Sequence, residues 1–277
     1  MTEFQTIGKA SKTTRLSYLG NINSSAKLLK NKKVSGQYTY IIYLAPAKSS
    51  GYNVCSHSTS ECRIGCLATS GRAGMEVICG GSCIKNARIK KTRLFFEDTA
   101  FFMAWMIAEI SKYQKKALKD GFGFSVRLNG TSDIDWQNVI VDGQNIFQIF
   151  PEVMFYDYTK NPNKFNHLPL NYHLTMSYTG RNGHVCEALL EKGHNVAVVF
   201  NVKKKQPLPE TFYGYKVVDG DLTDYRPDDG KGVIIGLRFK LIADREAAKL
   251  LRESVFVVDP ANVHGAMSNN VEILAIA

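Results

Sequence analysis

Five of the six cysteines lie close together in the first third of the chain, and their spacing could support metal chemistry. Cys55, Cys62 and Cys66 follow a C-x6-C-x3-C pattern, and Cys79 and Cys83 form a later C-x3-C pair. Thiolates bind soft metals and iron–sulfur clusters, and a long glycine-rich segment can wrap around such a group. The pattern favours a metal site over inert core cysteines. The sixth, Cys186, shares a predicted helix face with leucines and is expected in the core.

Two kinds of metal site fit this segment. The favoured one is a [4Fe–4S] cluster held by Cys55, Cys62 and Cys66, with the fourth iron bound by Cys79 or Cys83, or left open. Zinc is the alternative, since the Cys62/Cys66 and Cys79/Cys83 pairs loosely match the ligand spacing of tetrahedral zinc sites. A fourth thiolate would make the cluster structural or electron-carrying, whereas an open iron could bind a substrate or cofactor.

Polar residues follow two predicted strands, where the loops of α/β folds commonly build a binding site. Arg127 could bind a carboxylate or phosphate of a ligand through two hydrogen bonds, or form an internal ion pair with Asp133 or Asp157. Lys160 could serve as a general acid or a phosphate contact, or be a solvated loop residue. We therefore expect a pocket for a small-molecule ligand that is built from Arg127, Asn129, Ser132, Asp133, Asp157 and Lys160.

The elements that must position these residues alternate along the chain. Strands are predicted at 38–45, 123–128, 153–156, 172–176, 196–201, 216–219, 233–237 and 255–259. Helices are predicted at 84–96, 99–119, 183–192 and 244–252. Short, mostly apolar strands separated by crossovers indicate an α/β fold with a parallel sheet. A complete or distorted (β/α) barrel is the favoured architecture, and an open doubly wound sheet is the alternative.

The predicted domain organisation follows from this order. Residues 1–37 form a polar, basic arm, and residues 38–277 form a single barrel-like domain. The metal-binding loop, 47–83, comes directly after the first strand and before the others, so it is an insertion within that domain. A long loop without secondary structure is unusual in a compact domain and is usually functional.

Charge is unevenly distributed along the chain. Residues 1–120 hold 19 Lys and Arg against 7 Asp and Glu, whereas residues 121–277 hold 16 against 18. The basic first third, including the predicted helix 84–96, could contact phosphates, so nucleic acid is a candidate partner. This supports an alternative function: a non-enzymatic factor that binds nucleic acid or protein, in which zinc or a closed cluster folds the basic loop.

The remaining sequence features concern the compartment. The longest apolar runs are far shorter than the roughly 18–20 residues of a membrane span. The amino-terminal residues lack the apolar core of a secretion signal. We therefore expect a cytoplasmic protein without membrane contact, in which clustered cysteines favour metal binding over disulfides.

The position of the cysteine segment resembles the layout of radical S-adenosylmethionine enzymes, in which a cluster-binding loop follows the first barrel strand. The usual C-x3-C-x2-C motif of those enzymes is absent here, and Arg127–Asp133 stands where their glycine-glycine-glutamate motif is expected. The resemblance is one of layout, and it implies S-adenosylmethionine as a candidate cofactor and radical or redox chemistry as a candidate activity.

Several stretches resemble a family of phage and plasmid proteins, the gene-product-88-like group. They include Leu44-Ala45-Pro46, Ser50-Gly51-Tyr52-Asn53-Val54-Cys55, Cys66-Leu67, Arg127-Leu128-Asn129-Gly130-Thr131-Ser132-Asp133, Phe155-Tyr156-Asp157-Tyr158-Thr159-Lys160 and Asn171-Tyr172-His173-Leu174. The resemblance implies a phage or prophage origin and brings no assigned activity. Its recurring cysteines match Cys55, Cys62 and Cys66, whereas Cys79 and Cys83 look like additions. The main hypothesis is a phage-type iron–sulfur protein with a ligand pocket. If it is an enzyme, an open cluster beside that pocket would support radical or redox chemistry.

Overall fold

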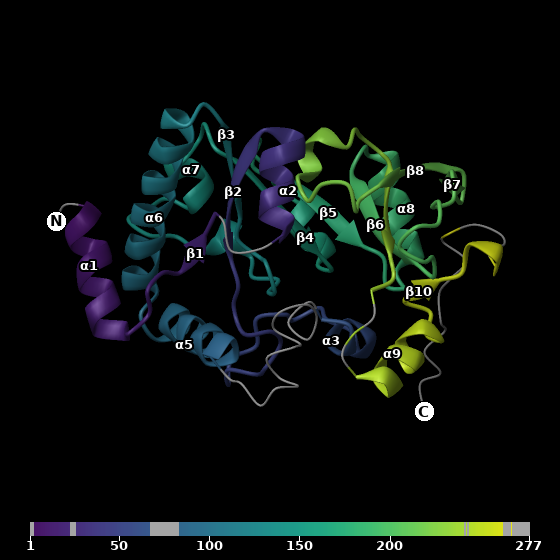
Figure 1. Ribbon diagram of the computed structural model, residues 1–277, viewed down its shortest axis with the longest axis horizontal. Coiled ribbons are helices and arrows are strands. Elements are labelled where there is room, and N and C mark those ends of the chain that lie inside the picture. Colours follow the sequence, from purple (N-terminus) through teal and green to yellow (C-terminus); the bar gives the residue numbers. More distant parts are fainter. Residues whose placement is uncertain are drawn as a thin grey trace.

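The computed structural model describes residues 3–22, 26–66, 83–240, 242, 244–262 and 267. In these residues the chain forms one mostly parallel sheet with helices packed against it (Figure 1). The strands are β1 (Gly20–Asn21), β2 (Gln37–Ile42), β3 (Gly123–Arg127), β4 (Met154–Thr159), β5 (Tyr172–Ser177), β6 (Asn195–Phe200), β7 (Thr211–Phe212), β8 (Tyr215–Asp219), β9 (Ile234–Arg238) and β10 (Val257–Val258).

The helices lie mostly between consecutive strands, as expected for parallel crossovers. They are α1 (Glu3–Thr14), α2 (Ala26–Ser35), α3 (Ser60–Ile64), α5 (Cys83–Glu97), α6 (Thr99–Lys119), α7 (Ile146–Ile149), α8 (Gly183–Glu191) and α9 (Arg245–Arg252). Short 3-10 turns are η2 (Trp136–Asn138), η3 (Pro162–Phe165), η4 (Arg226–Asp228) and η5 (Pro260–Asn262). All eight predicted strands and all four predicted helices overlap observed elements, so the α/β class is confirmed.

The sheet is open, so the favoured barrel is not formed. Its strand order is β1-β2-β3-β4-β5-β6-β9-β8-β7, and β10 pairs with β6. The two ends of the sheet, β1 and β7, are two-residue strands that pair antiparallel with β2 and β8. Strands this short offer few hydrogen-bonding groups to each other, so the edges do not join.

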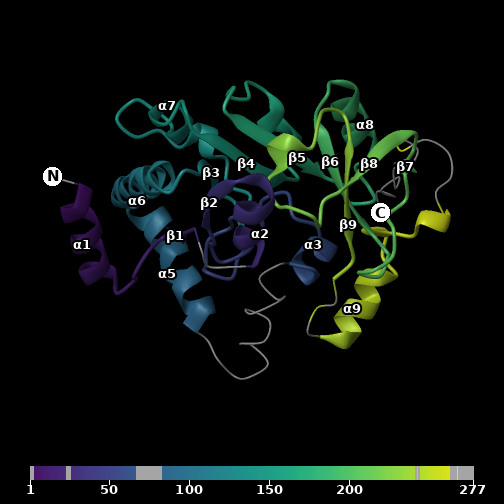
Figure 2. The same ribbon diagram turned by 45° about the horizontal axis from the view of Figure 1, so that its top comes forward.

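Helix α2 covers one face of the open sheet (Figures 1 and 2). The Asn31 amide nitrogen of α2 donates to Thr39 Oγ1 of β2 at 2.9 Å and to Tyr156 OH of β4 at 3.0 Å. The Asn31 side-chain oxygen accepts from the backbone N–H of Asp224 at 2.8 Å, in the segment after β8. A single buried amide thus joins two strands to a segment from the far half of the sheet.

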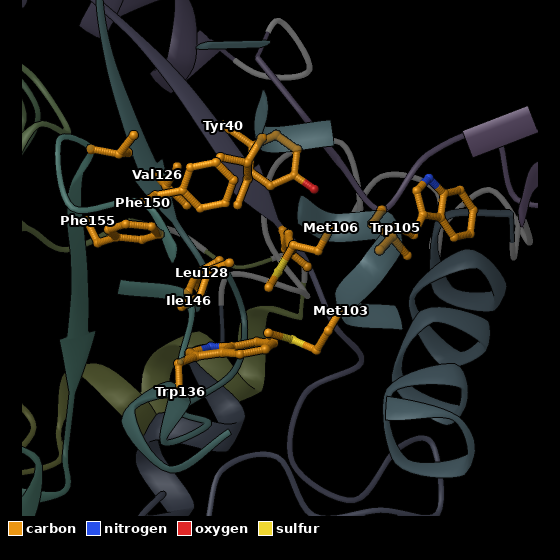
Figure 3. Packing of buried hydrophobic residues seen from close by; sticks show 14 of the residues in the cluster. Tyr40, Met103, Trp105, Met106, Val126, Leu128, Trp136, Ile146, Phe150 and Phe155 are labelled. Atoms are coloured by element: carbon orange, nitrogen blue, oxygen red, sulfur yellow. The ribbon is translucent and has the colours of Figure 1, made fainter. Parts of the chain in front are cut away.

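The opposite face of the sheet carries the hydrophobic core. Helix α6 begins after the N-cap Asp98, whose side chain accepts from the backbone N–H of Phe101. Its buried residues pack on apolar side chains of β2, β3 and β4, and Trp136 lies among them (Figure 3). Cys186 of α8 is fully buried in a second cluster with Leu189 and Leu190, so its predicted core position is confirmed.

In the described residues the predicted arm is folded: α1 packs against α6 beside this core, and α2 covers the other face of the sheet. Leu16, Leu19 and Leu28 are buried, whereas Tyr18 and Leu29 are exposed. The buried carboxylate of Glu109 in α6 accepts from the backbone N–H of Leu19 at 3.0 Å and from Tyr40 OH at 2.7 Å. These bonds fix the short strand β1 beside β2.

Candidate functional site

A cavity of about 1240 Å³ opens at the carboxyl ends of the parallel strands. Its lining comes from the cysteine segment, from the loops after β3, β4, β5, β6, β8 and β9, and from α2 and α9. This is where ligands bind in open α/β sheets. The lining includes five of the predicted pocket residues and three of the predicted metal ligands: Arg127, Asn129, Ser132, Asp133, Lys160, Cys55, Cys62 and Cys66.

The cysteine segment is fastened to the sheet by backbone hydrogen bonds. Val54 accepts from the backbone N–H of Asp133 at 2.7 Å, which places Cys55 beside the loop after β3. The short helix α3 carries Cys62 and is N-capped by Thr59, whose hydroxyl accepts from the Cys62 N–H at 3.2 Å. A Cβ at Gly65 would lie only 2.6 Å from Leu251 Cδ2, so the glycine permits close packing of this segment on α9.

The structure separates Cys55, Cys62 and Cys66 from Cys83. Cys55, Cys62 and Cys66 are partly buried and line the cavity. Cys83 is exposed at the start of α5 and lies outside the cavity lining. Cys79 lies outside the described residues.

The thiols that line the cavity are free of disulfides. Burial, with a smaller contribution from the neighbouring Asp133, Cys66 and Cys62, raises the pKa of the Cys55 thiol to about 11. Cys55 therefore needs a cation to become a thiolate at neutral pH. In the described part of the chain, no three His, Cys, Asp or Glu side chains are grouped to hold a single metal ion.

Asn129 shapes the loop that follows β3. Its side-chain oxygen accepts from Ser132 Oγ at 2.8 Å, from the Ile134 N–H at 2.9 Å and from Trp136 Nε1 at 3.1 Å. A Cβ at Gly130 would lie 2.5 Å from the Ile42 carbonyl oxygen, so this turn passes close to the end of β2. Asn129 and Ser132 thus position the cavity wall through bonds to each other and to the backbone.

The carboxylate of Asp133 accepts three hydrogen bonds from other residues of the protein. Its carboxylate accepts from Lys164 Nζ at 2.6 Å, from Thr159 Oγ1 at 2.8 Å and from the Lys160 N–H at 3.0 Å. Lys164 is buried, so this ion pair joins the loops after β3 and β4 firmly. Asp133 therefore holds the shape of the cavity.

Asp157 is fully buried and lies outside the cavity lining. Side chains alternate along β4, so Asp157 points to the face opposite Tyr156 and Tyr158. It accepts from the Asn129 N–H at 2.8 Å and from Tyr172 OH at 3.0 Å. Burial raises the pKa of Asp157 to about 7, against the opposing effect of Arg127.

Arg127 lines the cavity and forms an ion pair that the sequence did not indicate. Arg127 Nη1 lies 2.6 Å from Asp224 Oδ2, and both side chains are about 95% buried. Neither Asp133 nor Asp157 is its partner, because the segment after β8 folds back over the sheet face that carries Arg127. The guanidinium also lies over the Tyr158 ring, 4.9 Å from its centroid.

Several charged residues of the cavity lining lie outside the predicted set of pocket residues. Arg238 Nη1 donates to both carboxylate oxygens of Asp219 at 2.9 Å. Asp219 and Arg238 are the last residues of β8 and β9, and Asp221 follows β8. The rule that strand ends build the site therefore signals these three residues. The rule gives no signal for Lys30, which lines the cavity from α2. Lys30 Nζ donates to the Asp221 carbonyl at 2.7 Å.

Helix α5 is the basic helix that was predicted to contact phosphates, and several of its cationic side chains contact groups within the protein. Lys91 is buried and its Nζ donates to the Leu19 carbonyl at 2.6 Å. Arg93 Nε donates to the Ser50 carbonyl at 3.1 Å, and Arg88 lies over the Tyr43 ring. These three cations of α5 therefore contact groups of the protein itself.

Among the described residues, no helix combines the length and apolar character needed to cross a bilayer.

Acid should loosen α3, because an ion pair anchors it to the loop after β5. Arg181 Nη1 lies 2.7 Å from Glu61 Oε1 and holds the pKa of Glu61 at about 2, below its ordinary 4.5. A lowered carboxylate pKa stabilises the fold fully above about pH 4.5, and this stabilisation is lost as pH falls toward 2. Since the Arg181 side chain is 38% exposed, we expect at most about 1 kcal/mol.

Urea unfolding of wild type and Glu61→Gln checks this expectation. The variant should be less stable at neutral pH and equal to wild type near the acid end of the window. A difference that stays constant across the window would contradict the role of the ion pair.

These features define an open α/β protein with a cysteine-lined cavity at the carboxyl edge of its sheet. Residues 13–253 match the phage-type family described as Gene product 88, and the chain belongs to that family. Searches of curated proteins and of solved structures gave no match.

Proposed function

We propose that this protein binds a [4Fe–4S] cluster through Cys55, Cys62 and Cys66, and that the adjoining cavity receives a small-molecule ligand. The observation that carries the proposal is the convergence of these three cysteines on one cavity, although eleven positions separate the first from the last. The same cavity is lined by the loops at the strand ends. A cluster in this wall would face the ligand directly.

The donor set fits such a cluster. Each cysteine of a [4Fe–4S] site binds a different iron, so the three thiols need to surround a group larger than one ion. They come from separate backbone positions: Cys55 precedes α3, Cys62 lies within it, and Cys66 follows it. Cluster binding would remove the proton from the buried Cys55 thiol, and the basic surroundings would partly offset the added negative charge.

The fourth iron is proposed to face the cavity without a thiolate from Cys83. This residue is exposed and lies outside the cavity lining, whereas the three proposed ligands share it. An iron without a fourth protein thiolate can bind a substrate or cofactor, and the cluster can supply an electron. This arrangement supports an enzyme of radical or redox type, with S-adenosylmethionine as the cofactor to be tested first.

Anaerobic purification tests the cluster directly. The protein should be brown and contain about four iron and four sulfide per chain. Titration with S-adenosylmethionine should then change the electron paramagnetic resonance signal of the reduced cluster; an unchanged signal argues against this cofactor. A colourless protein with one zinc per chain would overturn the proposal. It would favour a structural metal site and a non-enzymatic binding role.

A further inference from the structure

The cavity carries an excess of positive charge. Eight basic and four acidic residues line it. The acidic residues already have cationic partners: Asp219 and Asp221 pair with Arg238, Asp224 pairs with Arg127, and Asp133 pairs with Lys164. Among the described residues, the lining therefore keeps a net positive charge that is available to a ligand.

Lys160 is the cation in the cavity wall with the clearest need for an anion. It is partly buried in the loop after β4, and its ammonium group has no hydrogen bond or ion pair with a described residue. The nearby Asp133 accepts from the Lys160 backbone and from Lys164. The Lys160 Nζ lies 5.9 Å from the centroid of the Phe256 ring. Partly burying a charge without a partner is unfavourable, so this position suits an incoming anion.

Arg127 lies in the wall of the same cavity and has one donor without an acceptor. It is 4% exposed, its Nη1 binds Asp224, and its buried Nε has no acceptor. Buried polar groups are normally hydrogen-bonded, and each exception calls for an explanation. A guanidinium with unmet donors suits the oxygens of a phosphate or carboxylate.

The cavity also offers room and apolar surface for the uncharged part of a ligand. The rings of Tyr158, Tyr178, Phe239 and Phe256 line it, together with aliphatic side chains. Its volume of about 1240 Å³ exceeds what a bare anion fills. Binding sites for small organic ligands commonly combine such apolar walls with a few directed polar groups.

We infer that the cavity binds a small organic molecule bearing phosphate groups, with its phosphates held by Arg127 and Lys160. Several cations around one cavity match a multiply charged anion better than a single carboxylate, and Lys203 and Lys204 add charge at its exposed side. The inference deepens the proposed function, because it names the ligand class of the same cavity. It does not require the cluster.

Calorimetric titration with pyrophosphate and with adenosine triphosphate tests the inference, with adenosine as the uncharged comparison. Lys160→Ala should weaken binding of both anions about tenfold, because it removes one charge-assisted contact. Lys119→Ala is the matched control, since Lys119 is exposed at the end of α6 and lies outside the cavity lining. Its affinity should equal that of wild type.

A second variant tests Arg127 without leaving a buried charge unpaired. Arg127→Gln combined with Asp224→Asn removes both charges and should also weaken pyrophosphate at least tenfold. Circular dichroism checks that each variant is folded. Absence of pyrophosphate binding to wild type, or affinity unchanged in both variants, would overturn the inference. Tighter binding of citrate than of pyrophosphate would overturn the choice of phosphate.

Repeating the titration on protein with Cys55, Cys62 and Cys66 all changed to Ser separates the two proposals. Pyrophosphate binding should persist within about threefold, because the proposed contacts come from other residues. Binding by a protein that never contains iron would uphold the anion site and reject the cluster. An iron-loaded protein that binds no anion would do the reverse.

Discussion

Asp224→Ala is expected to lower the free energy of unfolding by about 3–5 kcal/mol, because it leaves Arg127 charged in the interior without its partner. The two side chains are only 5% and 6% exposed, and their N···O distance is 2.6 Å. The pair also joins β3 to the segment after β8, which are far apart along the chain. Urea unfolding measures the loss.

Two further variants make this measurement specific. Replacing both partners by apolar residues, Arg127→Met with Asp224→Leu, should cost much less than Asp224→Ala alone, since no charge remains unpaired. Lys116→Ala removes an exposed ion pair with Asp120 and should cost less than about 1 kcal/mol. If Asp224→Ala costs no more than Lys116→Ala, the buried pair does not stabilise the fold.

Changing any one of Cys55, Cys62 or Cys66 to Ser is expected to reduce bound iron at least tenfold in anaerobically purified protein. A serine hydroxyl is a poor replacement for a thiolate, and each of the three proposed ligands holds a different iron. All three line one cavity, so the loss should be similar at each position. Iron and sulfide analysis, together with visible absorption, measures the effect.

Cys186 and Cys83 supply the matched controls. Cys186 lies in α8 and is fully buried in the core, where burial raises its pKa to about 12. Cys186→Ala should keep its iron while losing some stability. Cys83→Ser should also keep its iron, since the exposed Cys83 lies outside the cavity lining. Iron loss limited to Cys83→Ser would contradict the proposed ligand set.

The predictable part of this fold is carried by local patterns. Strand β6 is an apolar, β-branched run ended by Asn201, and α6 is an amphipathic run with Asp98 at its start and Gly121 after its end. These signals depend on residues a few positions apart, and they give the order of the elements. The same order places polar residues such as Asn129 and Asp133 at strand ends, where the cavity lies.

The sequence therefore predicted correctly that the cavity lies at the carboxyl ends of the strands. The role of each side chain there depends on contacts with residues far away in the chain. The sequence could not indicate that Asp133 would be taken by Lys164, because that pairing depends on how two loops fold against each other. It suggested Asp157 as a pocket residue, but the alternation of side chains along β4 buries it on the other face.

The sequence by itself determined eight of the strands, the four helices α5, α6, α8 and α9, and the cysteine segment after β2, since each depends on neighbouring residues. Only the tertiary structure decided that the sheet stays open, that α2 covers one face, and that Arg127 pairs with Asp224. These features depend on contacts between segments far apart in the chain. Such contacts form only where packing and buried hydrogen bonds outweigh the entropy of bringing the segments together.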